Sequence, residues 1–84
     1  MLNFIAAATI WYLTAYVPYA VYDADLMYLE GVKFSSGGEC SIYGQEAART
    51  DQFPPYSTAW ACLTIEQIVI ERARLKLERE GKLT

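Results

Sequence analysis

Apolar and polar positions divide the chain into three segments of different character. The stretch from Leu2 to Tyr22 has 21 residues without a charge, residues 23–56 mix acidic, glycine and proline positions, and residues 57–84 begin apolar and end charged. As a helix, the first segment would extend roughly 30 Å, about the thickness of a bilayer core. We therefore predict an N-terminal apolar, transmembrane helix at about residues 3–20.

Tyrosines would give this predicted helix one distinctive face. Tyr12, Tyr16 and Tyr19 are spaced by four and three residues, which places them along one side of a helix. Because a phenol hydroxyl needs a partner within a membrane, we expect this stripe to face protein. The favoured interpretation is packing against a partner, and the alternative is contact with a cofactor or quinone that a neighbouring subunit holds.

The same segment also has the alternation of a strand. Trp11, Leu13, Ala15 and Val17 recur at every second position, almost as regularly as the tyrosines follow a helical period. This pattern keeps open a second hypothesis, in which the chain is a soluble α+β domain.

The middle segment predicts irregular structure with a short β-hairpin at about residues 31–43. Val32 and Phe34 alternate with polar neighbours before a Ser-Gly-Gly turn, and Cys40 and Ile42 alternate after it.

A long C-terminal helix is predicted at about residues 58–80. Ser57 or Thr58 would form its N-cap, and Gly81 follows its last charged turn. The predicted fold is thus mainly α, in three parts: an apolar membrane helix (1–22), an acidic loop region with the possible hairpin (23–56), and a C-terminal helix with a charged tail (57–84).

Composition and charge exclude several classes of function. The 84 residues carry a net charge of −3 without a basic stripe, which argues against nucleic-acid binding. Histidine is absent, so this chain cannot supply a Ser-His-Asp triad or an imidazole ligand for haem or iron. Two cysteines cannot form a structural zinc site. We therefore expect no catalytic residue, no metal and no cofactor.

Two further features are candidate sites. Cys40 and Cys62 are 22 positions apart and would form a disulfide in an oxidising compartment, or remain two small buried residues in the cytosol. Glu66 interrupts the apolar part of the C-terminal helix. It would be an intramembrane functional group if residues 53–70 formed a second span, and a solvent-facing or paired acid otherwise.

These observations give one leading functional hypothesis and two alternatives. The leading hypothesis is a small non-catalytic accessory subunit, anchored in the lipid bilayer and packed on other protein subunits of a photosynthetic or respiratory type of membrane complex. An acidic stretch directly after the apolar run favours a cytoplasmic N-terminus and an extracytoplasmic acidic segment. The alternatives are a soluble acidic α+β binding or inhibitor module, and a two-span hairpin that uses Glu66.

Overall fold

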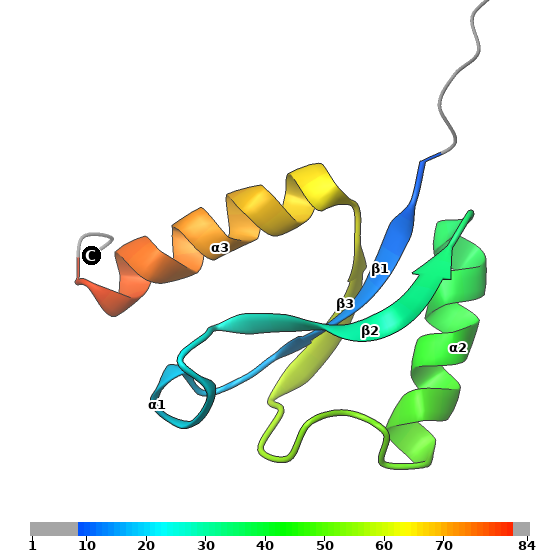
Figure 1. Cartoon of the computed structure of the whole chain (residues 1–84), viewed down its shortest axis with the longest axis horizontal. Coiled ribbons are helices and arrows are strands. Elements are labelled where there is room, and N and C mark those ends of the chain that lie inside the picture. Colours follow the sequence, from blue (N-terminus) through cyan, green and yellow to red (C-terminus); the bar gives the residue numbers. More distant parts are fainter. Residues whose placement is uncertain (1–8, 82–84) are drawn as a thin grey trace, which may run out of the picture.

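The computed structural model describes residues 9–81 and contains three strands and three helices in this range. They are β1 (Trp11–Tyr16), α1 (Tyr19–Tyr22), β2 (Leu26–Phe34), α2 (Gly37–Arg49), β3 (Ala59–Leu63) and α3 (Ile65–Arg79). Within the described range the strands form one antiparallel sheet in the order β2-β1-β3 (Figure 1). The fold is therefore α+β, and the prediction of a mainly α chain is wrong.

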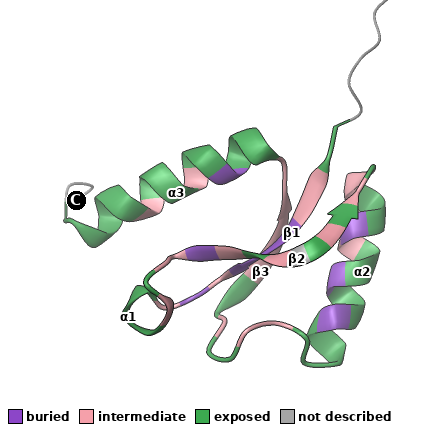
Figure 2. Ribbon diagram, in the orientation of Figure 1, coloured by how far each residue is buried: buried purple, intermediate pink, exposed green. Residues whose placement is uncertain are grey.

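The two longer helices lie on opposite faces of this sheet. Leu13 of β1 is buried in one cluster with Cys40 and Ala47 of α2, whereas Tyr16 of the same strand donates a hydrogen bond to Glu71 of α3. Since successive side chains of a strand point to opposite faces, α2 covers one face and α3 the other. Figure 2 shows buried positions along α2, while α3 is mostly exposed, with Ile68 as its one buried residue.

The predicted N-terminal helix is wrong because residues 11–16 form the central strand. It pairs with β2 and β3 on its two sides, and Leu13, Thr14 and Ala15 are completely buried. Pro18 follows the strand and precedes the single turn of α1. Residues 3–8 of the prediction lie outside the described residues.

The predicted membrane location is wrong as well. Among residues 9–81, none of the helices has the length and apolar character needed to cross a bilayer. The transmembrane helix, the single-pass topology with a cytoplasmic N-terminus, and the second span at residues 53–70 are therefore wrong.

The predicted hairpin at residues 31–43 is wrong, because only its first strand exists. Val32 and Phe34 belong to β2, but Cys40 and Ile42 lie in α2. The Ser-Gly-Gly sequence starts a helix instead of a hairpin turn, because Ser36 is the N-cap and its hydroxyl accepts from the Glu39 backbone N–H.

The predicted C-terminal helix at residues 58–80 is divided in two. Its first part is strand β3, and the helix begins only after Thr64, whose side chain accepts from the Gln67 backbone while the Gln67 side chain accepts from the Thr64 N–H. This reciprocal pair is a capping box, and it fixes the N-terminus of α3 six residues later than expected from Thr58.

A close contact between α2 and β3 organises the core. The backbone of Gly44 lies against the Trp60 ring, and a Cβ at this position would lie 2.2 Å from Trp60 Cζ3. A disulfide joins Cys40 of α2 to Cys62 of β3 across the same interface. Both contacts fix α2 against the strand that follows the loop of residues 50–58.

Candidate functional site

The loop between α2 and β3 contains an unusual turn at Pro54–Ser57. The Ser57 N–H donates to the Pro54 carbonyl at 3.2 Å, Pro55 is the second residue, and Tyr56 is the third, with φ at +69°. This combination is typical of a type II turn, in which glycine or asparagine normally takes the third position. A bulky side chain is rare in this region of backbone space, and holding it there costs on the order of 1–3 kcal/mol.

Tyr56 differs in this respect from the other described residues with positive φ. Asp23 and Asp51 also have positive φ, but they follow the ends of α1 and α2, where Asp tolerates the left-handed conformation. The remaining cases between residues 9 and 81 are Gly31 and Gly81. Tyr56 is thus the bulky residue for which the local sequence offers no conformational reason.

Hydrogen bonds hold the turn on both sides. The Tyr22 hydroxyl donates to the Pro55 carbonyl at 2.6 Å, and the Ser57 hydroxyl donates to the Pro54 carbonyl at 2.5 Å. The Thr58 N–H then donates to the Tyr16 carbonyl at 2.9 Å, which ties the loop to the end of β1. The backbone that carries Tyr56 is therefore fixed, although the loop is on the surface.

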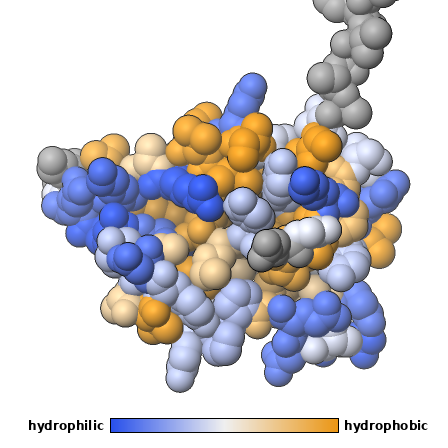
Figure 3. All heavy atoms as spheres, viewed as in Figure 1, coloured by the Kyte–Doolittle hydropathy of each residue, from blue (hydrophilic) through white to orange (hydrophobic). Residues whose placement is uncertain are grey.

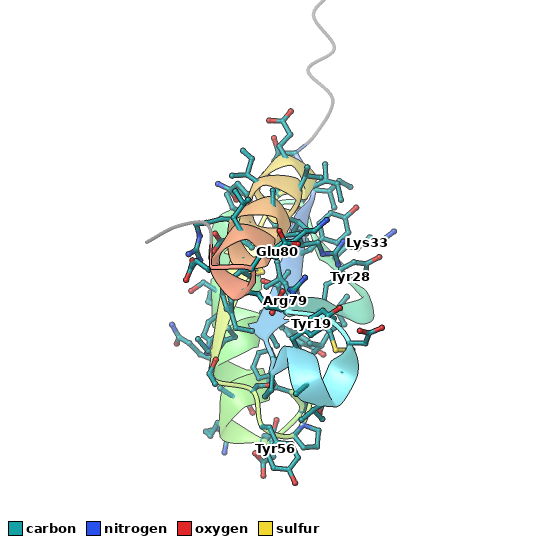
Figure 4. The ribbon with its side chains drawn as sticks, turned by 90° about the vertical axis from the view of Figure 1, so that its left-hand side faces the viewer. Tyr19, Tyr28, Lys33, Tyr56, Arg79 and Glu80 are labelled. Carbon is teal, nitrogen blue, oxygen red and sulfur yellow. A yellow bond between two sulfur atoms is a disulfide. The ribbon has the colours of Figure 1, made fainter. Side chains whose placement is uncertain are left out.

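The side chain of Tyr56 is presented to solvent. It is 74% exposed, and Figure 4 shows it at the far end of the molecule from α3, away from the labelled residues Tyr19, Tyr28, Lys33 and Arg79. The strain is therefore not compensated by burial of the ring.

A hollow of about 440 Å³ lies beside this tyrosine. Phe53 and Trp60 stack in its wall with their ring centroids 6.0 Å apart, and Asp51 is the charged residue among those that line it. The hollow therefore combines aromatic surface with a carboxylate. No backbone strain or pocket of this kind could be read from the sequence, where Pro54-Pro55 indicated only a stiff loop.

The tyrosine stripe predicted from the sequence does not exist as a unit. Tyr12 and Tyr16 share the α3 face of β1, but Tyr19 lies in α1. Each contacts residues of this chain: Tyr12 lies against Tyr28 at 5.6 Å between ring centroids, and the Tyr19 ring lies 3.7 Å from the guanidinium of Arg79.

Tyr16 has its own hydrogen-bonded partner on α3. Its hydroxyl donates to Glu71, and burial, followed by this bond to a carboxylate, raises the pKa of Tyr16 to about 12. Glu71 also accepts from Arg74 at 2.5 Å, and Arg74 first and Tyr16 second lower the pKa of the Glu71 carboxyl. This network fastens α3 to the central strand and is structural in character.

The other predicted site residues have plain structural positions. Glu66 is exposed in the first turn of α3, where a negative charge is favourable to the helix dipole. Cys40 and Cys62 are bridged, with Cα atoms 6.0 Å apart. Among the side chains that the structure describes, no group of three or more Cys, Asp or Glu is arranged to hold a metal ion.

Comparison with known proteins gives no further assignment. No protein-family model matches the sequence, and neither a curated protein nor a solved structure matches it. The functional argument therefore rests on the residues described above.

Proposed function

We propose that this chain is a small non-catalytic, disulfide-linked α+β module that binds another protein through the Tyr56 turn. The observation that carries the proposal is a fixed, strained backbone that presents a large aromatic side chain to solvent. Strain of this kind persists only where the surrounding structure imposes it, and it is concentrated at binding and active sites.

The chemistry of Tyr56 suits a binding anchor. Tyrosine is enriched among the few interface residues that contribute most of the binding energy, because it offers a large amphipathic area at a small entropic cost. The hydrogen bonds of Pro54, Pro55 and Ser57 fix the turn before any partner arrives, which reduces the ordering cost of association.

The surroundings of the turn indicate the kind of partner surface. Asp51 lies next to the Phe53–Trp60 pair in the adjoining hollow, and the chain as a whole carries a charge of −3. A partner with an apolar pocket for Tyr56 and a Lys or Arg for the hollow would be complementary, since an aromatic face and a carboxylate both attract a cation.

Site-specific photo-cross-linking tests the proposal. A photoreactive benzoylphenylalanine is introduced at position 56, or at the exposed position of Gln45 on α2 as a matched control, in the cells that produce the protein. We expect a discrete adduct from position 56 and not from position 45. Excess wild-type protein should suppress the adduct, whereas excess Tyr56→Gly protein should not. Equal adducts at both positions, or equal suppression by the glycine variant, would contradict the proposal.

A further inference from the structure

A second surface lies at the other end of the molecule, between α3 and the segment that joins α1 to β2. A cleft of about 280 Å³ is lined on one side by Arg72, Lys76 and Arg79 of α3 and on the other by residues that include Tyr19 and Asp25. In Figure 4 the labelled Arg79 and Tyr19 lie close together, and Tyr28 and Lys33 point to one side of them. The cleft is thus remote from Tyr56.

The three basic residues differ in how they are compensated. Arg79 forms an ion pair with Asp25 and lies over the Tyr19 ring. Arg72 lies 3.5 Å from the Leu26 carbonyl oxygen and its guanidinium lies 5.9 Å from the centre of the Tyr28 ring, two weak contacts that leave most of its donors free.

Among the side chains that the structure describes, neither Arg72 nor Lys76 forms an ion pair with a carboxylate. Other described ion pairs join Arg49 to Glu46 and Arg74 to Glu71 and Glu78. Arg72 and Lys76 are four positions apart on one side of a helix, a spacing at which like charges destabilise it by a few tenths of a kcal/mol. An anion between them would remove this repulsion.

Apolar side chains continue the same side of α3. Ile65, Val69, Arg72 and Lys76 are spaced by four, three and four residues, so they lie in one row along the helix. Ile65 and Val69 are 54% and 62% exposed. Figure 3 shows the corresponding change from hydrophobic surface over the first half of α3 to hydrophilic surface over its second half.

We propose that this row and the cleft beside it bind an extended acidic segment of a protein partner, one with an apolar residue about three positions from its acid. Val69 and Lys76 are about 10 Å apart along the helix, at 1.5 Å per residue, which an extended chain spans in about three residues. The planar guanidinium of Arg72 matches a carboxylate, and Lys76 adds a second cation.

The charges in the cleft favour a carboxylate over a phosphate. Asp23 and Asp25 line it together with the three basic residues, so its net charge is 3 − 2 = +1. One carboxylate would neutralise this charge, whereas a phosphate dianion would leave an excess negative charge beside the two aspartates. The apolar row before Arg72 also suits the side chain of a peptide rather than a free ion.

A titration followed by ¹⁵N NMR tests this proposal. The probe is the peptide acetyl-Gly-Leu-Ser-Ser-Glu-Gly-amide, compared with a peptide that has Gln in place of Glu, a peptide that has Ser in place of Leu, and inorganic phosphate. We expect a saturable change in the amide signals of residues 65–76, and at least about tenfold weaker binding of the Gln peptide, since a hydrogen bond to a charged group contributes about 1.5–3 kcal/mol.

Variants separate this surface from the rest of the molecule. The double change Arg72→Gln and Lys76→Gln should weaken binding of the probe at least about tenfold without loss of the fold, because both side chains are exposed. Arg49→Gln, an exposed charge on α2, should leave binding unchanged, and so should Tyr56→Gly. Equal binding of the Glu and Gln peptides, no saturable change at residues 65–76, or tighter binding of phosphate than of the peptide would overturn the proposal.

Discussion

Because of the backbone strain at Tyr56, we expect a glycine variant to be more stable than an alanine variant, which is the reverse of the order at an ordinary loop position. Replacement by Ala keeps a Cβ at φ +69°, whereas replacement by Gly removes it. At most surface positions Ala is the more stable of the two, because glycine has more conformational freedom to lose on folding. At position 56 we expect glycine to be the more stable residue.

The magnitude follows from two opposing terms. The left-handed conformation costs an L-residue roughly 1–2 kcal/mol, and glycine loses about 0.5–1 kcal/mol more backbone entropy than alanine on folding. The difference leaves Tyr56→Gly more stable than Tyr56→Ala by up to about 1.5 kcal/mol. Both variants lose the ring equally, so its contacts cancel in the comparison, and the hydrogen bonds at Pro54 and Pro55 remain in both.

Thermal and urea unfolding of the two variants measures this difference. A difference of 1 kcal/mol corresponds to about 4–8 °C in Tm for a domain of this size. The matched control is the same pair of changes at Gln52, an exposed residue of the same loop that does not have positive φ, where alanine should be the more stable. An alanine variant at position 56 that exceeds the glycine variant by the same margin as at position 52 would refute the strain argument.

Three other predictions concern the scaffold. Gly44→Ala should destabilise the fold by about 1–3 kcal/mol, because the added Cβ would collide with the Trp60 ring. Gly38→Ala is the control, since the nearest atom to its added Cβ is 3.9 Å away, and urea unfolding of both variants measures the difference. Reduction of the Cys40–Cys62 disulfide, or its replacement by two alanines, should lower the free energy of unfolding by about 3 kcal/mol. Equal free energies of unfolding with and without reductant would contradict this. Stability should fall as pH rises from 10 towards 12, because the native state keeps the Tyr16 proton that the unfolded chain releases. Tyr16→Phe should reduce this step, and an absorbance titration with every tyrosine near pH 10 would exclude it.

Part of the fold could be predicted from the sequence. The alternation of Trp11, Leu13 and Ala15 is the inward pattern of β1, and these side chains share the face that α2 covers. The helical character of residues 65–79 was predicted as part of a longer helix. The capping box of Thr64 and Gln67 was a local signal that would have set the correct start.

The central error came from a segment whose sequence fits two periods. Residues 11–16 satisfy both a helical and a strand pattern, and only their pairing with Leu26–Phe34 and Ala59–Leu63, distant along the chain, selects the strand. The absence of charge in residues 11–16 accompanies the complete burial of Leu13, Thr14 and Ala15 in this fold. A nonlocal pairing of this kind cannot be derived from the segment alone.

The sequence indicated the residue types of the candidate sites but not their geometry. Pro54-Pro55 indicated a stiff approach, but the turn that holds Tyr56 at positive φ also accepts a hydrogen bond from Tyr22, which only the fold brings to it. Likewise Arg72 and Lys76 are visible in the sequence as two basic positions of a charged helix. That neither forms an ion pair with a described carboxylate emerges only from the packing of α3.

The affinity of the partner recovered by cross-linking, measured for the wild-type chain and for Tyr56→Gly, tests the central claim most directly. A tyrosine that anchors the interface contributes at least about 2 kcal/mol, so the glycine variant should bind at least about 30-fold more weakly, although its fold is intact. A glycine variant whose Kd stays within about threefold of the wild-type value would show that the turn does not bind the partner.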